Sequence, residues 1–252
     1  MRIVLALAVF CGFGLCLAQA QNNADSVTAT NQAKYSGWVN LGFSGSRGNV
    51  ERKWNNYAFD ISRKTTKNVI TFDAQYRDFF SRGNKVDENI DGSLIDVRKI
   101  SGDSWLYTKI SYHRNTYRGF DHQWKFGGGY LHQFFDKEHF TLASRLGYQV
   151  RLSEVSGNLD GDYNQGVHHF ALIGFKTQFG VAENVTFKTK FDLELDVERG
   201  ENYSVLSKSD LVFKINKWLA FQMSYFYHYA GLPVTGRLAL DERLDGSLKI
   251  TF

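Results

Sequence analysis

Residues 184–199 read NVTFKTKFDLELDVER, and nearly every second position of this stretch is apolar. The apolar series is Val185, Phe187, Phe191, Leu193, Leu195 and Val197, and polar or charged residues stand between its members. Successive side chains of a β-strand point to opposite sides of the sheet, so a period of two predicts a strand. Its length and pattern predict one apolar face and one charged face.

The same alternation recurs along the chain, for example over 140–152 and 219–229. We expect roughly twelve such strands of ten or more residues, the number and length of a transmembrane β-barrel. Short polar turns alternate with longer links rich in Gly, Asp and Asn. The short turns fall at 64–68, 101–103, 136–138, 180–183 and 216–217, and the longer links at 81–88, 115–121, 154–165, 199–202 and 231–241, with 46–52 intermediate. This alternation predicts a single antiparallel up-and-down barrel whose short turns are periplasmic.

A soluble barrel would turn its apolar face inward, and a membrane barrel would turn it toward lipid. The membrane barrel is favoured because the strands are long for a soluble sheet and the opposite faces carry many charges. Aromatic residues also stand near the strand ends, as in the interfacial girdles of membrane barrels. Near the short turns these are Trp105, Phe135, Phe140 and Trp218.

The first twenty residues, MRIVLALAVFCGFGLCLAQA, have the plan of a secretory signal peptide. Ala18 and Ala20 form an A-x-A site, which predicts cleavage after Ala20; an uncleaved anchor is the alternative. We therefore expect a signal peptide over 1–20, a short periplasmic segment over 21–34 and a barrel over 35–252. Both cysteines, Cys11 and Cys16, lie in the predicted signal, so the mature chain would hold no disulfide or thiolate site.

The balance of basic and acidic residues limits the classes of molecule that the protein can be expected to bind. Thirty Lys and Arg against 26 Asp and Glu give a formal net charge of +4, which is too balanced to indicate nucleic-acid binding. We expect a cell outer-membrane location, contact with membrane lipid and lipopolysaccharide, and no cofactor or metal. The oligomeric state is left open.

The chain ends on RLDGSLKITF (243–252), a further alternating strand. Its apolar residues are Leu244, Leu248, Ile250 and Phe252. We expect this strand to pair with the first strand and so close the barrel without a free edge. A final strand that ends in Phe also resembles the signal by which barrel-assembly machinery recognises its clients.

Two stretches resemble the YdiY-like family, whose members are described as salt-induced outer membrane proteins and classed as a domain of unknown function. The first is GWVNLGFSGSRGNVERKWN (37–55), and the second is SYHRNTYRGFDHQWKFGGGYLHQFFDKEHFTLASRLGYQVR (111–151). The resemblance runs from about residue 37 to the end. It departs at Arg47 and Val50, where the family often carries Thr. It implies an outer-membrane barrel and supplies no reaction, and with it we expect a link to envelope or osmotic stress.

The charged strand faces form the candidate site. The proposed charge ladder consists of Lys188, Lys190, Asp192, Glu194, Asp196, Glu198, Lys208, Asp210, Arg145 and Arg151. It would either line a pore for small solutes or ions, or fill a narrow barrel with salt bridges. In the second case the protein would be a closed structural barrel that acts through its outer loops.

A third hypothesis is a lipid-modifying hydrolase. Ser111 and His113 share a strand face, and Asp121 follows in the next link. A hydrolase needs its nucleophile, base and orienting group in mutual contact, and i, i+2 neighbours on a strand stand roughly 7 Å apart. We therefore expect no catalytic residue and no enzyme activity.

Overall fold

The computed structural model describes residues 33–46, 52–81, 84–137, 139–155 and 162–252. Its elements are β1 (Lys34–Ser46), β2 (Arg52–Lys64), β3 (Asn68–Ser81), β4 (Asn84–Ser101), β5 (Ser104–Asn115), the 3-10 helix η1 (Thr116–Arg118), β6 (Phe120–Lys137), β7 (Phe140–Val155), β8 (Gly166–Ala182), β9 (Val185–Asp196), β10 (Tyr203–Lys214), β11 (Leu219–Ala230) and β12 (Leu240–Thr251). Within these ranges, no helix is long and apolar enough to cross a membrane.

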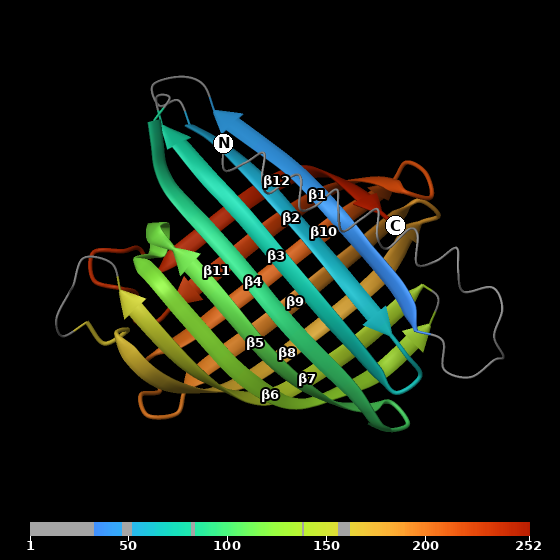
Figure 1. Ribbon diagram of the computed structural model, residues 1–252, viewed down its shortest axis with the longest axis horizontal. Coiled ribbons are helices and arrows are strands. Elements are labelled where there is room, and N and C mark those ends of the chain that lie inside the picture. Colours follow the sequence, from blue (N-terminus) through green and yellow to red (C-terminus); the bar gives the residue numbers. More distant parts are fainter. Residues whose placement is uncertain (1–32, 47–51, 82–83, 138, 156–161) are drawn as a thin grey trace. The chain divides into compact units, whose positions relative to one another are not determined.

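Each strand pairs with its neighbours in sequence, and β12 pairs with β1, so the sheet closes into an antiparallel barrel. Figure 1 shows these strands crossing the barrel obliquely, with β1 beside β12. The predicted all-β, twelve-strand, up-and-down barrel is confirmed. The barrel begins at Lys34, one residue before the predicted boundary. The predicted signal peptide, its Ala18 and Ala20 cleavage site and nearly all of segment 21–34 lie outside the described residues.

The final strand closes the barrel through its backbone. Phe252 N–H donates to the Gly37 carbonyl and Gly37 N–H donates to the Phe252 carbonyl, both at 3.0 Å. The pairing continues from Trp38↔Thr251 to Gly42↔Ser247. A Cβ atom on Gly37 would lie 2.8 Å from the Phe252 ring, so a glycine is needed for the terminal ring to pack there. Leu244, Leu248, Ile250 and Phe252 are all exposed on the outer face, and their recognition by assembly machinery stays a prediction.

The distribution of side chains is the reverse of that in a soluble domain. In the part of the chain that the structure describes, the buried side chains are mostly polar, among them Asn40, Asn89 and Gln149. The exposed ones include a large set of Phe, Leu, Ile, Tyr and Trp, such as Leu41 and Leu94. Soluble proteins bury their large apolar residues. An apolar exterior around a polar interior is the arrangement of a barrel whose outer solvent is lipid.

Two predictions made from local pattern are wrong. The link over 81–88 is mostly strand, because β4 starts at Asn84 and its first residues pair with β3 across a bulge at Phe79/Phe80. Trp105 does not belong to the outer girdle, because it shares its face with the buried Tyr107 while Leu106 and Ile110 are exposed. Phe135, Phe140 and Trp218 are exposed, as a girdle requires.

Gly147 on β7 makes room for one aromatic ring from β5. Tyr107 on β5 pairs with Gly129, and Gly129 pairs with Gly147 on β7. A Cβ atom on Gly147 would lie 2.1 Å from the Tyr107 hydroxyl oxygen, and one on Gly129 would lie 2.0 Å from the Leu146 carbonyl oxygen. Gly147 therefore lets Tyr107 lie against the inner wall, where it is 5% exposed, and Gly129 lets the backbones of β6 and β7 approach closely.

Candidate functional site

The inner wall holds most of the predicted charge ladder. Register and burial place nine of its ten members on the inner face of β7, β9 and β10: Arg145, Arg151, Lys188, Lys190, Asp192, Glu194, Asp196, Lys208 and Asp210. Glu198 is the exception, since it is exposed in the turn after β9. The strand ends at Asp196 because its carboxylate accepts the backbone N–H groups of Glu198 and Arg199, at 2.9 and 3.2 Å.

Two acidic ladder residues, Asp192 and Glu194, are each matched by two cations. Asp192 accepts from Arg145 Nε at 3.0 Å and lies 2.9 Å from Lys190 Nζ. Glu194 pairs with Arg151, and Lys125 Nζ lies 3.5 Å from the same carboxylate oxygen.

The Arg151 guanidinium also stacks 3.8 Å from the centre of the Phe170 ring. Because Lys125, Arg145, Arg151 and Lys190 stand against Asp192 and Glu194, the wall formed by β6 to β9 has no net negative charge, although β9 carries three acids.

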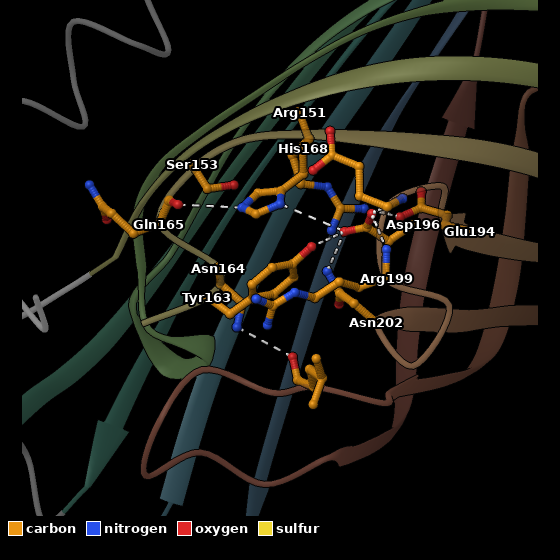
Figure 2. Close-up of polar contacts among 12 residues, drawn as sticks. Arg151, Ser153, Tyr163, Asn164, Gln165, His168, Glu194, Asp196, Arg199 and Asn202 are labelled. Carbon is orange, nitrogen blue, oxygen red and sulfur yellow. Dashed lines mark hydrogen bonds and ion pairs between the residues drawn. The ribbon is translucent and has the colours of Figure 1, made fainter. Parts of the chain in front are cut away.

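Asp196 is the centre of a network at the loop end of the barrel. Figure 2 shows its carboxylate accepting hydrogen bonds from Tyr163 Oη at 2.8 Å and from Asn202 Nδ2 at 2.9 Å. His168 Nδ1 lies 3.7 Å away, and the Arg199 guanidinium lies 4.1 Å from the centre of the Tyr163 ring. The Asp196 side chain has no exposed surface. This network fastens the end of the β7–β8 link to β9 and to the β9–β10 turn, which is a structural role.

A cavity of about 710 Å³ occupies the lumen. It is lined by residues near the long-loop end, such as Asn164 and Val234, and by residues near the short-turn end, such as Trp38 and Lys249. Lys190 and Lys208 face this cavity, yet 48% and 51% of their side-chain surfaces are exposed. Exposure of mid-strand, inward-facing side chains means that the cavity is wide enough to hold water.

The β11–β12 loop crosses the mouth of the lumen. Residues 231–239 connect strands that lie five to six strands from β6 around the ring. Residues of this loop nevertheless contact the opposite side of the barrel, just before β6 and in the β7–β8 link. Val234 is 3% exposed and packs on Gly119, where a Cβ atom would come within 2.8 Å of it. Asn164 Nδ2 donates to the Leu232 carbonyl at 3.3 Å. We call residues 231–239 the strap.

Asp162 holds the strap from the β7–β8 link. Its carboxylate accepts the backbone N–H groups of Thr235 and Asn164, both at 2.8 Å. Burial raises the pKa of Asp162, but these hydrogen bonds outweigh it and leave the pKa below its usual range. The attachment is therefore fully formed above about pH 4, the ordinary value for Asp, and weakens only as the pH falls below it.

The structure joins Ser111 and His113 to an acid that the sequence did not single out. His113 Nδ1 lies 2.7 Å from Asp91 Oδ1, and His113 Nε2 lies 3.3 Å from Ser111 Oγ. The acid is Asp91 on β4, opposite His113 in register, and not Asp121. Ser111 is 2% exposed and is not part of the cavity lining, so its oxygen is not presented to a substrate there.

Several lumen residues were missed because only register reveals them. Lys125 stands beside Arg151, and Lys176 stands beside Lys190. The alternation within each strand predicts that both lysines point inward. It does not predict which residues of the neighbouring strands lie opposite them. Within the described ranges, no three His, Asp or Glu side chains come together as a metal site.

These features define the class: the chain folds as an outer-membrane-type β-barrel with a polar, porin-like lumen. A family model described as "Protein of unknown function, DUF481" matches residues 39–252, and the chain belongs to this family. The family is the one that the YdiY-like resemblance indicated.

Solved structures share the barrel. The NanC porin superposes with a TM-score of 0.50 at 11% identity, over 85% of this chain and 97% of that one. The KdgM porin gives 0.48 at 9% identity, over 85% and 99%. The translocator domain of autotransporter NalP from Neisseria meningitidis gives 0.47 at 14% identity, over 98% and 96%. No curated protein matches the chain.

Proposed function

We propose that the protein is a narrow pore of the bacterial outer membrane that passes small hydrophilic solutes. The observation that carries this is the cavity of about 710 Å³, which has polar and charged walls and is lined from the strap to the short-turn end. Barrels of eight strands are just wide enough to be filled by side chains, and those of sixteen or more leave an aqueous channel. Twelve strands with many Ser, Asn and Gln on the inner face stand between these limits.

A liposome-swelling assay tests the proposal. The refolded chain is placed in vesicles, which are then diluted into isotonic solutions of uncharged sugars of rising mass. We expect rapid swelling with the smallest sugars and a steep decline with size, because the lumen is narrow and bridged by the strap. Swelling no faster than that of protein-free vesicles, from barrels that are folded and inserted, would contradict a pore.

The second candidate, a closed barrel that acts through its loops, is favoured by the strap alone. Val234 is buried against Gly119, and Asp162 and Asn164 hold the strap backbone from the far side of the mouth. In this case the cavity would be a sealed interior, and the outer loops would carry the function.

Replacing residues 232–238 with a Gly-Ser linker of the same length separates the two candidates. We expect the single-channel conductance to rise about two- to threefold, because the change removes the apolar anchor from the mouth and leaves the wall intact. Lys217→Gly, a change in the exposed β10–β11 turn at the opposite end of the barrel, serves as the control and should leave the conductance unchanged. A closed native barrel that conducts only after the strap is replaced would support the second candidate.

A further inference from the structure

Three lysines stand side by side on the inner wall. Lys176 on β8 is opposite Lys190 on β9, and Lys190 is opposite Lys208 on β10. The alternation along the three strands directs all three side chains into the lumen. Side chains directly opposite one another on adjacent strands begin about 5 Å apart, and like charges there are destabilising. A sheet that places three ammonium groups in one row needs something to offset their repulsion.

Two more lysines extend the row toward the short-turn end. Lys249 on β12 is repelled by Lys188 and Lys208, and Lys188 is repelled in turn by Lys176 and Lys208. Lys188, Lys190, Lys208 and Lys249 all line the cavity. We call these four residues and Lys176 the lysine cluster.

The acids near the lysine cluster do not balance it. Asp192 is shared between Lys190 and Arg145, and Asp210, 3.6 Å from Lys208, is shared with the more distant Lys188 and Lys249. Asp60 attracts Lys249 but is itself repelled by Asp73. Among the described residues, no carboxylate lies within ion-pair distance of Lys176, Lys188 or Lys249. A net positive charge therefore remains in a narrow lumen with low-dielectric walls, where it acts more strongly than on an open surface.

We propose that the lysine cluster is a binding site for small multivalent anions, of the carboxylate or phosphate class, on the path through the lumen. This inference rests on the proposed function, because a site inside the lumen acts on solutes only if they enter the pore. The ammonium groups come from four strands on one side of the barrel, and four of the five line the cavity, so an anion that carries two or three charges can contact several of them together. A monovalent anion cannot, and the site therefore favours multivalent solutes.

Citrate, pyrophosphate and acetate are the probes. The refolded full mature chain is studied in planar bilayers at low salt, because screening weakens such contacts. We expect citrate and pyrophosphate to block the current at concentrations at least about tenfold below that of acetate. The order of the two blockers distinguishes a site that prefers carboxylates from one that prefers phosphates.

The test variant is the double substitution Lys190→Gln and Lys208→Gln, which keeps an unbranched polar side chain at each position and removes two charges. We expect it to raise the half-blocking citrate concentration about tenfold. The matched control is Lys67→Gln with Lys217→Gln, which removes two charges from exposed short turns at the same end of the barrel. Equal citrate block in wild type, variant and control would overturn the site.

A second readout does not need an open pore. Citrate should raise the unfolding temperature of the detergent-refolded wild-type barrel, relative to sodium chloride of equal ionic strength, and should do so far less in the double variant. Conductance without any citrate effect would overturn the site and leave the pore standing. A silent barrel that citrate stabilises only when the two lysines are present would contradict the pore and leave the site standing.

Discussion

Replacing Asp196 with alanine should lower the free energy of unfolding of the refolded barrel by about 3 kcal/mol. The carboxylate is fully buried and accepts hydrogen bonds from Tyr163, Asn202 and two backbone N–H groups. Alanine would leave all these donors without their acceptor, and an unsatisfied buried polar group costs more than a hydrogen bond contributes. Urea unfolding, followed by tryptophan fluorescence in detergent, measures the change.

Glu198→Ala is the matched control for this prediction. Glu198 is an acid two residues away in the same segment, but its side chain is exposed. Its substitution should change the free energy of unfolding by less than about 0.5 kcal/mol. Equal effects of the two substitutions would contradict the structural role given to the Asp196 network.

Gly147→Ala should destabilise the barrel by about 2 kcal/mol through overpacking. The new Cβ atom would lie 2.1 Å from the Tyr107 hydroxyl oxygen and 2.8 Å from the backbone carbonyl oxygen of Gly128. The ring can move, but the backbone of β6 cannot move without disturbing its pairing with β5 and β7. The free energy of unfolding is again the quantity to measure.

Two comparisons sharpen this second prediction. Gly200→Ala adds the same methyl group at a turn position where nothing lies within 4 Å, and it should be close to neutral. Combining Gly147→Ala with Tyr107→Ala should recover part of the loss, because the two side chains compete for one space. Strictly additive losses would show that the clash with Tyr107 is not the cause.

Much of the fold could be predicted from the sequence, because alternation along a strand is a local property. The pattern of residues 184–199 predicts both the strand and its inward face, and turns such as 216–217 separate one strand from the next. Trp105 shows where this fails, because Trp105, Leu106 and Tyr107 are consecutive apolar residues and their parity is ambiguous. The 81–88 segment was mistaken for a loop because its polar residues extend β4 beyond the apolar stretch.

The lumen was less predictable, because it depends on which strands lie side by side and in which register. Arg145 and Asp192 are 47 residues apart, and nothing local indicates that they meet. On the inner face of β9 itself, two bases, Lys188 and Lys190, stand beside three acids, Asp192, Glu194 and Asp196. The structure places cations from β6 and β7 against them, and the balance on that wall becomes positive. The strap was visible as a long link, but its path across the mouth was not.

The most direct test of the pore is the single-channel conductance of the refolded protein in a planar bilayer, with a salt gradient across the membrane. We expect stable current steps and a reversal potential that reports anion preference, because the lumen is water-filled and its lysines outnumber the acids beside them. A folded, inserted barrel that passes no current, or one that prefers cations, would contradict this expectation.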